Sequence, residues 1–463
     1  MIEFLWLVAS VCFILALSGL STQATARRGN LLGVIGMVLG IGATLASGRP
    51  NPLWMVAAMV PAAVLGAVIA NRIRMESMPQ FVALLHSFVG VGAMLVGVAG
   101  YYNHPSETLD AARVVHLVEC YLGVIIGAIT FTGSVVAFGK LQEWISSKPL
   151  LYPGRHMVTG GLFLVSLGLG AAFVMTQGAV PLWVGAALAG ILGVLLVMSI
   201  GGADMPVVVS MLNSYSGWAA AATGFLLGND LLIITGALVG SSGAILSHIM
   251  CKAMNRSLFN VILGGFGATA AGGPSEEAAR LAAKGVKSTA VDDVVELMRI
   301  SRQVIIVPGY GMAVAQAQHA VREMTELLQK EGATVRYAIH PVAGRLPGHM
   351  NVLLAEANVP YPIVLEMDDI NQDFSDTDLV LVLGANDIVN PDALENPQSA
   401  LAGRPVLEVW KSRTVVTIKR GLNPGFAGID NPLYYRDNSL MLFGDARKMV
   451  EGLVNALKGA GHH

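Results

Sequence analysis

The residues best suited to chemistry lie at the end of a short β-branched run. Residues 304–308 (Val-Ile-Ile-Val-Pro) are followed at once by the turn Gly309-Tyr310-Gly311-Met312-Ala313-Val314-Ala315. This is the strand–turn–helix layout of a dinucleotide phosphate site, in which the first glycine allows a tight turn and the second lets the backbone approach a pyrophosphate. Val314 stands where the usual motif has its third glycine. An ordinary tight turn between a strand and a helix would explain the same residues, so the motif alone leaves both interpretations open.

A second group of residues indicates which nucleotide would bind. The next expected strand ends at His340-Pro341, near where an NAD-binding chain would carry an acidic residue for the ribose hydroxyls. A later strand, residues 414–418, ends in Lys419-Arg420. Two adjacent cations suit a 2′-phosphate, because arginine offers a planar fork and lysine a point charge. The sequence therefore predicts NADP(H) rather than NAD(H), although a solvated basic edge closing the strand would have the same residues.

The composition indicates a membrane protein with a soluble domain. The 463 residues are 54% hydrophobic and 13% charged, far from a soluble average. Up to Arg256 there are 11 Lys and Arg and 8 Asp and Glu, whereas the shorter remainder holds 18 and 23. We expect a transmembrane domain at 1–256, a Gly- and Ala-rich linker at 257–290 and a Rossmann-like domain at 291–463. The three cysteines show no paired spacing, so no disulfide framework and no metal site are predicted.

Nine apolar segments are each about long enough to cross a bilayer. They are approximately 4–20, 31–47, 53–70, 82–101, 117–139, 158–175, 181–200, 206–226 and 231–250. Nine basic residues lie in loops on the side of the C-terminal domain, and two, Arg49 and Arg113, lie on the opposite side. Since cytoplasmic loops are enriched in Lys and Arg, the C-terminal domain is expected in the cytoplasm. The nine are Arg27, Arg28, Arg72, Arg74, Lys140, Lys148, Arg155, Lys252 and Arg256.

The C-terminal domain is expected to be an α/β fold with a parallel sheet. Apolar strands alternate with helical segments, which favours a sheet covered on both faces. Strands are expected near 303–307, 334–339, 361–366, 378–383, 405–409 and 414–418, with helices near 311–330, 349–357 and 444–458.

Polar residues inside apolar segments are candidates for function because they are costly in lipid. His86 lies in the fourth segment, and histidine titrates near physiological pH, which suits a proton relay. Asn213 belongs to a polar stripe on the eighth segment, with Ser210, Ser214 and Gly217. Such a stripe could contact His86 or hold water, or it could simply bond one helix to another. Asp204 precedes this segment and could be an end-cap or part of a proton pathway.

Long runs of the sequence resemble the β subunit of the proton-translocating NAD(P) transhydrogenase, over nearly the whole chain. They are residues 85–90 (LHSFVG), 130–140 (TFTGSVVAFGK), 201–222, 308–315 (PGYGMAVA), 340–354, 384–387 (GAND) and 407–411 (LEVWK). The resemblance implies that the C-terminal domain binds NADP(H) and exchanges hydride with NAD(H) on a partner α subunit, coupled to proton movement. The α subunit would also supply further membrane helices. The assembly would be a dimer of heteromers in a bacterial inner membrane, with no nucleic acid among its partners.

The resemblance also assigns site residues by position. The intramembrane histidine, the channel amide and the acidic residue of the family correspond to His86, Asn213 and Asp204. The pyrophosphate turn corresponds to residues 309–315, the arginine loop to Val342-Ala343-Gly344-Arg345, and the residues near the nicotinamide to Asn386 and Asp387. The 2′-phosphate pair corresponds to Lys419 and Arg420. The loop that closes over the nucleotide corresponds to residues 423–428 with Gly425 and Phe426, where a tyrosine is expected in many relatives.

Two rival functions fit the same architecture. One is a transporter or channel whose cytoplasmic domain senses a nucleotide, although no selectivity-filter motif and no inverted repeat is evident. The other is a membrane NADPH oxidoreductase that does not pump protons. An NAD-binding partner would favour transhydrogenation over both.

Overall fold

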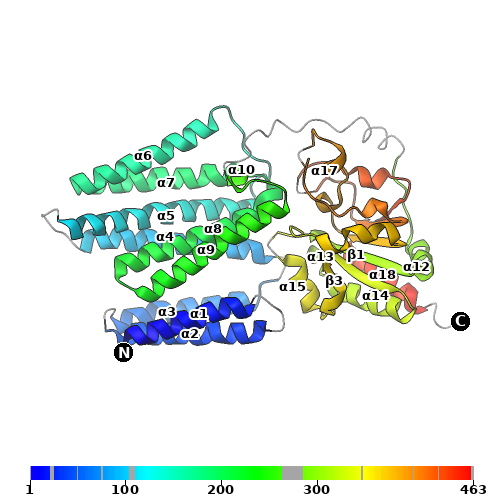
Figure 1. Ribbon diagram of the computed structural model, residues 1–463, viewed down its shortest axis with the longest axis horizontal. Coiled ribbons are helices and arrows are strands. Elements are labelled where there is room, and N and C mark those ends of the chain that lie inside the picture. The colour runs from blue at the N-terminus through cyan, green and yellow to red at the C-terminus, as the bar shows by residue number, and fades with distance from the viewer. Residues whose placement is uncertain are drawn as a thin grey trace. The chain divides into compact units, whose positions relative to one another are not determined.

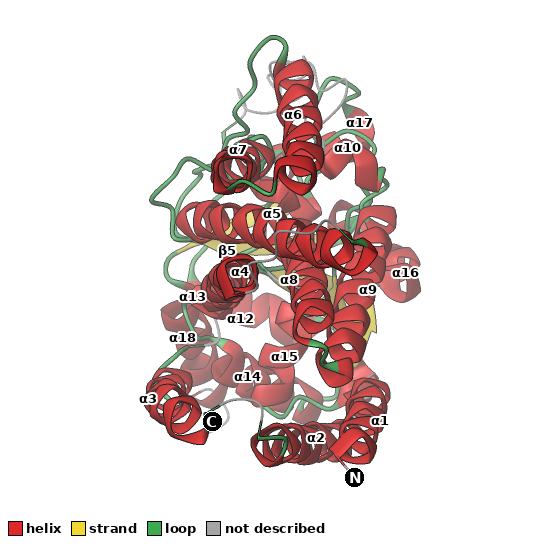
Figure 2. Cartoon of the chain, turned by 90° about the vertical axis from the view of Figure 1, so that its left-hand side faces the viewer, coloured by secondary structure: helices red, strands yellow, loops and turns green. Residues whose placement is uncertain are grey.

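The computed structural model describes residues 2–20, 25–48, 51–74, 77–103, 110–262, 285–345, 348–399, 401–425 and 427–459. The chain divides into two compact units. The first comprises Met1–Gln142, Leu151–Ser199 and Val209–Ser247, and the second comprises Glu143–Leu150, Ile200–Val208 and His248–His463. Within the described residues the strands belong to the second unit. Figure 2 colours the strands yellow.

Nine long helices occupy the described part of the chain up to Ala253. They are α1 (Ile2–Leu20), α2 (Ala26–Ala46), α3 (Pro52–Ala70), α4 (Met78–Asn103), α5 (Ala111–Leu141), α6 (Arg155–Thr176), α7 (Ala179–Met198), α8 (Met205–Leu227) and α9 (Asp230–Ala253). Each corresponds to one predicted apolar segment. Eight of them, all except α8, are both long and apolar enough to cross a membrane. The serines, Asn213 and Tyr215 lower the hydropathy of α8.

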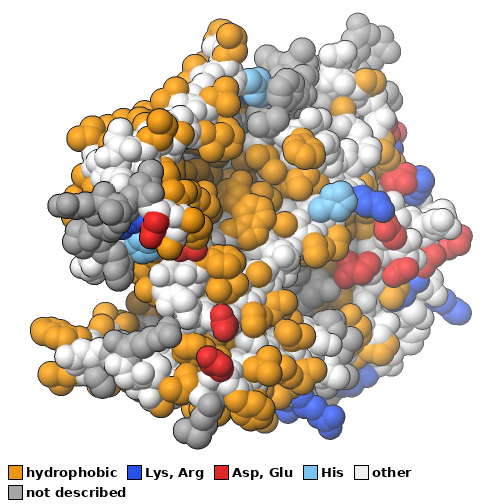
Figure 3. Space-filling model, turned by 60° about the vertical axis from the view of Figure 1, so that its left-hand side comes forward, with side chains coloured by type: hydrophobic (Ala, Val, Ile, Leu, Met, Phe, Trp, Pro, Cys, Tyr) orange, Lys and Arg blue, Asp and Glu red, His pale blue; other side chains and the backbone are white. Residues whose placement is uncertain are grey.

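The surface of the helical unit is strongly apolar, as a bilayer requires. Leu53 and Trp54 at the start of α3 are each 74% exposed, and orange side chains cover much of the face in Figure 3.

Glycines let pairs of helices in this unit approach closely. A Cβ added at Gly90 of α4 would lie 2.6 Å from the backbone nitrogen of Phe131 in α5. A Cβ at Gly217 of α8 would lie 2.2 Å from the nitrogen of Gly240 in α9. Since real side chains do not come this close to backbone, these seams require glycine.

The second unit is built on a six-stranded parallel sheet with the strand order β3-β2-β1-β4-β5-β6. Two of its strands, β1 and β3, are labelled in Figure 1. The strands are β1 (Gln303–Pro308), β2 (Thr334–Ile339), β3 (Val364–Glu366), β4 (Leu379–Leu383), β5 (Thr414–Lys419) and β6 (Ser439–Phe443). β1 and β4 are neighbours at the point where the strand order reverses. Ligands of such sheets bind beyond the carboxyl ends of the strands at this point.

Helices cover the sheet because their apolar residues recur every three or four positions. In α14 (Gln318–Lys330) the buried residues Val321, Met324 and Leu328 follow this spacing. Two more amphipathic helices, α12 (Val291–Ile300) and α18 (Ala446–Gly459), pack together. The predicted parallel α/β fold is confirmed.

Two predicted strands differ from the structure, and one strand of the sheet was not predicted. Residues 405–408 are irregular and lead into a short 3-10 helix, η6 (Val409–Lys411), so the predicted strand at 405–409 is wrong. Its apolar character reflects a buried loop, in which Leu407 is fully buried and its N–H donates to the carbonyl of Ile388. The sixth strand is β6, which the sequence reading missed. The predicted strand at 361–366 is regular only over β3, after a 3-10 turn at Tyr361–Ile363.

The predicted helices agree with the structure except for one break. The predicted helix at 311–330 is two helices, α13 (Tyr310–Val314) and α14, because Gln316 has a φ of 52°. α15 (His349–Glu356) and α18 match the other two predictions closely.

The segment just before α12 lies along the outer edge of β6. Met441 donates its N–H to the carbonyl of Lys287, and Thr289 donates its N–H to the carbonyl of Met441. Ser288 thereby forms a parallel bridge with Met441. The predicted linker, 257–290, contains a short helix, α10 (Leu258–Ile262), but its residues 263–284 lie outside the described residues.

Candidate functional site

The turn after β1 packs backbone against backbone on the turn after β4. Gly309 donates its N–H to the carbonyl of Leu383, and Gly311 donates to that of Gly384, each over 2.9 Å. A Cβ at Gly311 would lie 2.7 Å from the Cα of Gly384, and one at Gly309 would lie 2.4 Å from the Cα of Ala385. Gly384 also has a φ of +63°. The two glycines of the motif are therefore required by this crossing, before any ligand is considered.

The predicted residues of the turn do not all face the same space. Tyr310 and Gly311 line a cavity beside the carboxyl ends of the strands, and Val314 lines an adjacent one. Met312 and Ala313 are buried in the core, and neither they nor Ala315 line these cavities. For these three predicted residues, only the backbone is a candidate for contact with a ligand.

The first cavity brings together residues from several loops that the sequence placed in one site. Its lining includes Gly309, Tyr310, Gly311, Val342, Ala343, Gly344, Arg345, Asn386, Asp387 and Gly425. Arg345 lies over the ring of Tyr310, with its guanidinium carbon 4.1 Å from the ring centroid. This stacking holds a cation at the wall of the cavity.

The arginine loop is held by neutral histidines. Arg345 donates its N–H to Nδ1 of His349 over 3.2 Å, and Val342 donates its N–H to Nδ1 of His340 over the same distance. His340 Nε2 therefore carries the proton and donates to the carbonyl of Pro405. Burial lowers the pKa of His340 to about 4, and burial together with the positive charge of Arg345 lowers the pKa of His349 to about 4. At neutral pH both rings serve as uncharged anchors.

The predicted cation pair lies at the adjacent cavity, beyond β5. Lys419 and Arg420 line it together with Gly311 and Gly384, which border both cavities. Lys419 donates to the carbonyl of Asn423, and Arg420 forms an ion pair with Asp445 over 2.7 Å. Two cations thus stand next to the glycine turn, which is the arrangement that a phosphate group would need.

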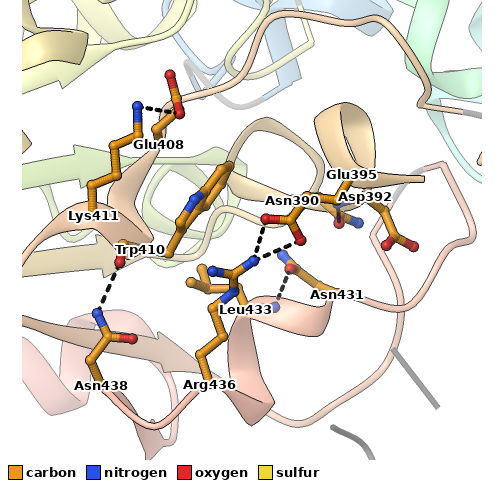
Figure 4. A network of polar contacts seen from close by, with 10 residues as sticks. All are labelled: Asn390, Asp392, Glu395, Glu408, Trp410, Lys411, Asn431, Leu433, Arg436 and Asn438. Carbon is orange, nitrogen blue, oxygen red and sulfur yellow. Dashed lines mark hydrogen bonds and ion pairs between the residues drawn. The ribbon is translucent and has the colours of Figure 1, made fainter. Parts of the chain in front are cut away.

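Asn386 presents a donor that no described residue satisfies. The N–H of Leu433 donates to Asn431 Oδ1 over 3.0 Å (Figure 4), which fixes the other atom of that amide as the donor Nδ2. Asn431 Nδ2 donates to Asn386 Oδ1 over 3.0 Å, and the hydroxyl of Tyr434 donates to the same oxygen over 2.8 Å. The remaining atom, Asn386 Nδ2, is buried without a partner.

Asp387 presents an acceptor beside that donor. Its Oδ2 accepts the N–H of Ala427 over 2.8 Å, whereas its Oδ1 is buried without a partner among the described residues. A Cβ at Gly425 would lie 2.4 Å from this Oδ1 and 2.7 Å from Asn386 Nδ2, so both atoms lie close to the backbone of Gly425. Burial raises the pKa of Asp387, although the Ala427 N–H, Arg404 and Lys419 oppose the shift. The predicted contact of Phe426 lies outside the described residues.

The segment after Asn431, which contains Leu433 and Arg436, is held in place by an ion pair. Arg436 forms a two-oxygen contact with Glu395 and stacks on Trp410, with its guanidinium carbon 5.3 Å from the ring centroid (Figure 4). Asn438 donates to the carbonyls of Trp410 and Ser412. These contacts hold the chain after the predicted closing loop in one place, and with it the orientation of the Asn386 amide.

Asp204 is part of a buried ion-pair group within the second unit. Its carboxylate accepts from Arg404 over 2.9 Å and from Arg256 over 3.2 Å, and its side chain is 10% exposed. Removal of either arginine would leave this buried carboxylate incompletely paired, which is costly. Its predicted place in a proton pathway stays a prediction.

His86 is hydrogen-bonded to Ser216 within the helical unit. The Ser216 hydroxyl lies 2.9 Å from His86 Nδ1, and His86 Nε2 is buried without a partner among the described residues. The sequence offered Asn213 and its polar stripe as candidates to contact His86 or to hold water, and the direct contact is made by Ser216, one helical turn after Asn213 in α8. A water-mediated role for Asn213 stays a prediction.

The rest of the polar stripe joins two helices. Ser210 donates to the carbonyl of Gly243, and Ser214 donates to that of Gly240, both in α9. For these two residues the packing interpretation is confirmed. Ser216 could have been found in the sequence, because it follows Asn213 by three residues in a segment that is otherwise largely apolar.

Comparison with known proteins agrees with this arrangement. The family model described as NAD(P) transhydrogenase beta subunit matches residues 2–456. Two relatives, both NAD(P) transhydrogenase subunit beta from Rhodospirillum rubrum, are 52% identical over 456 residues, which is 98% of this chain and 98% of theirs.

The chain belongs to the NAD(P) transhydrogenase beta-subunit family.

Family membership confirms the resemblance seen in the sequence, and it supports a transhydrogenase subunit over a nucleotide-regulated transporter or channel. The apolar helices and the family together identify a membrane protein. The transhydrogenase family also implies the use of nicotinamide nucleotides.

Proposed function

We propose that the second unit of this chain binds NADP(H) and exchanges hydride with NAD(H) held by an alpha subunit. The observation that carries the proposal is the pairing of the glycine crossing at Gly311 and Gly384 with the cations Lys419 and Arg420 beside it. The unpartnered polar atoms of Asn386 and Asp387 add a donor and an acceptor that a polar ligand would satisfy.

Each group of residues has a defined part in this proposal. Lys419 and Arg420 would bind the 2′-phosphate, and the backbone of residues 309–315 would lie along the pyrophosphate. Arg345, stacked on Tyr310, would neutralise a further phosphate charge. The bound nucleotide supplies the hydride chemistry, so the protein needs no side chain as acid or base in that step. Its contribution is to hold and orient the ring, for which Asn386 and Asp387 are the candidates.

We further propose that the helical unit carries protons through His86. A histidine with one ring nitrogen engaged and the other buried and unpartnered is suited to take up and release a proton. Coupling then requires that the protonation state of His86 changes the affinity of the second unit for NADP(H), and by linkage the reverse.

The proposed setting is a bacterial inner membrane with the second unit in the cytoplasm. The excess of basic residues in the loops and helix ends on that side supports this orientation. The alpha subunit would bring the NAD(H)-binding domain and further membrane helices, and the complex would be a dimer of heteromers.

Reconstitution with the alpha subunit tests the proposal. The co-purified complex in proteoliposomes should transfer hydride between NADH and an NADP⁺ analogue, and a pH-sensitive dye should report proton movement in step with it. Hydride transfer without proton movement would identify an oxidoreductase that does not pump. Binding of NAD(H) but not NADP(H) by this chain alone would refute the cofactor assignment.

A further inference from the structure

The contact between Ser216 and His86 defines which ring nitrogen carries a proton. Ser216 Oγ lies 2.8 Å from the carbonyl oxygen of Leu212, one turn earlier in α8, and 2.9 Å from His86 Nδ1. A carbonyl oxygen cannot donate, so at this distance the single hydroxyl proton must point to Leu212. The hydroxyl oxygen can then only accept from the ring, and Nδ1 must carry a hydrogen.

The protonation of the other ring nitrogen, Nε2, follows from this assignment. A neutral imidazole has one N–H and one lone pair, so the lone pair of neutral His86 is on Nε2. Nε2 is buried and has no partner among the described residues. It is therefore the basic nitrogen, and its lone pair accepts from no donor among the described residues.

We propose that Ser216 is a positioning residue that holds Nδ1–H of His86 and confines proton uptake and release to Nε2. The proposal rests on the proton route through His86 described above. Because the Nδ1–H···Oγ bond is present whether or not Nε2 is protonated, the ring need not turn or lose a hydrogen bond during a cycle. Each proton would enter and leave through the same nitrogen.

The alternative tautomer is the one expected without Ser216. A neutral histidine whose Nδ1 has no acceptor is free to carry its proton on Nε2, which would leave the wrong nitrogen basic. Removal of the hydroxyl should therefore change the tautomer as well as the proton flux. A purely structural serine would not affect the tautomer.

The neighbouring serine provides a matched control. Ser214 is on the same helix and, like Ser216, is buried and hydrogen-bonded to a backbone carbonyl, that of Gly240. Ser214→Ala removes a hydroxyl of the same size from α8, but it does not remove the His86 contact. Ser216→Thr keeps both the hydroxyl and the bond to the preceding turn.

Nitrogen NMR on the complex labelled with ¹⁵N-histidine tests the assignment. The full chain, co-purified with the alpha subunit, is placed in lipid nanodiscs, and the His86 signals are identified as those missing from His86→Asn. At a pH where His86 is neutral, the wild type and the Ser216→Thr and Ser214→Ala variants should show protonated Nδ1 and unprotonated Nε2. Ser216→Ala should show a mixture or the reverse. A wild-type signal for protonated Nε2 would overturn the proposal without requiring any variant to fold.

Proton pumping in proteoliposomes gives the second readout. Loss of one hydrogen bond to the ring should slow pumping by about tenfold in Ser216→Ala, while Ser216→Thr and Ser214→Ala stay near wild type. If Ser216→Ala pumps normally while His86→Asn does not, the positioning role is refuted and the route through His86 stands. If His86→Asn also pumps normally, the proposed proton route itself has failed.

Discussion

The nucleotide site beyond β1 and β4 and the surroundings of His86 both contain buried polar atoms that have no partner among the described residues, but the two sites are built in different ways. Around Gly311 and Gly384 the arrangement is set by backbone crossing backbone, and a single added carbon would clash. Around His86 the arrangement is set by one side-chain contact, between the Ser216 hydroxyl of α8 and the His86 ring of α4. A site made from backbone is sensitive to any side chain added to it, whereas a site made from one side-chain pair is sensitive to the chemistry of that pair.

The largest expected effect comes from replacing His86, because its ring is the group proposed to take up and release the transported proton. His86→Asn should abolish proton pumping and slow coupled hydride transfer, because an asparagine amide does not take up a proton near physiological pH. At a pH where His86 is neutral, the NADPH affinity of the complex without a proton gradient should stay within about twofold, since the substitution then changes no charge and the second unit keeps all of its own contacts. Dye-monitored pumping and equilibrium NADPH binding measure the two effects. Normal pumping in a well-folded variant would show that the proton route does not pass through His86.

The cations at the nucleotide site should show a graded effect. Lys419→Ala and Arg420→Ala should each weaken NADPH binding by about 1.5 kcal/mol, which is near the low end for hydrogen bonds to charged groups. The low value is expected for Arg420 because its side chain is largely exposed to solvent. NADH binding should not change, because it lacks the 2′-phosphate. Arg413→Ala, which removes a more exposed arginine that pairs with Asp378, is the control. Equal losses for both nucleotides, measured by titration calorimetry, would contradict the assignment.

The backbone crossing can be tested with one added carbon. Gly384→Ala should destabilise the second unit by about 1–3 kcal/mol, since the new Cβ would meet Gly311 at 2.4 Å and φ is +63°. Gly332→Ala also has a positive φ, +94°, but nothing lies within 4 Å, so it isolates the conformational cost. The thermal unfolding temperature of the purified complex should fall further for Gly384→Ala. Equal shifts would mean that the crossing is not tightly packed.

The smallest expected effect concerns pH and Asp387. Because burial raises its pKa, the ionised carboxylate is less favourable in the folded chain than in the unfolded one. Its contribution to stability is therefore lost as the pH rises from the ordinary carboxyl range through the raised pKa. Asp387→Asn should raise the unfolding temperature at a pH well above the ordinary carboxyl range, and the gain should shrink as the pH falls towards that range. A gain that grows in acid would show that the pKa is lowered instead.

The sequence predicted the nucleotide fold well where local signals are strong. β1 contains a continuous β-branched run and is followed directly by Gly309, and it was found almost to the residue. The break at Gln316 was missed because glutamine forms helices readily, so a positive φ there has no local signal. Residues 405–409 were misread because an apolar buried loop looks like a strand, and β6 was missed because it is a short edge strand.

The candidate site residues could likewise be predicted only where the signal is local. The helical position of His86 was predictable, but its partner depends on how α4 and α8 are rotated toward each other, which the pattern of one helix does not contain. The free donor of Asn386 follows from a chain of contacts through Asn431 and Leu433, far along the sequence. No local motif encodes such a chain.

The bridge between Ser288 and Met441 has a practical consequence for anyone who expresses the nucleotide-binding part alone. The backbone of 287–289 occupies hydrogen-bonding groups of β6 that would otherwise be open at the edge of the sheet. A fragment that began at residue 291 would leave that edge uncovered, and an open edge strand invites pairing with another molecule. A fragment that starts at residue 285 or earlier keeps this cover and should remain monomeric at concentrations where the shorter one aggregates.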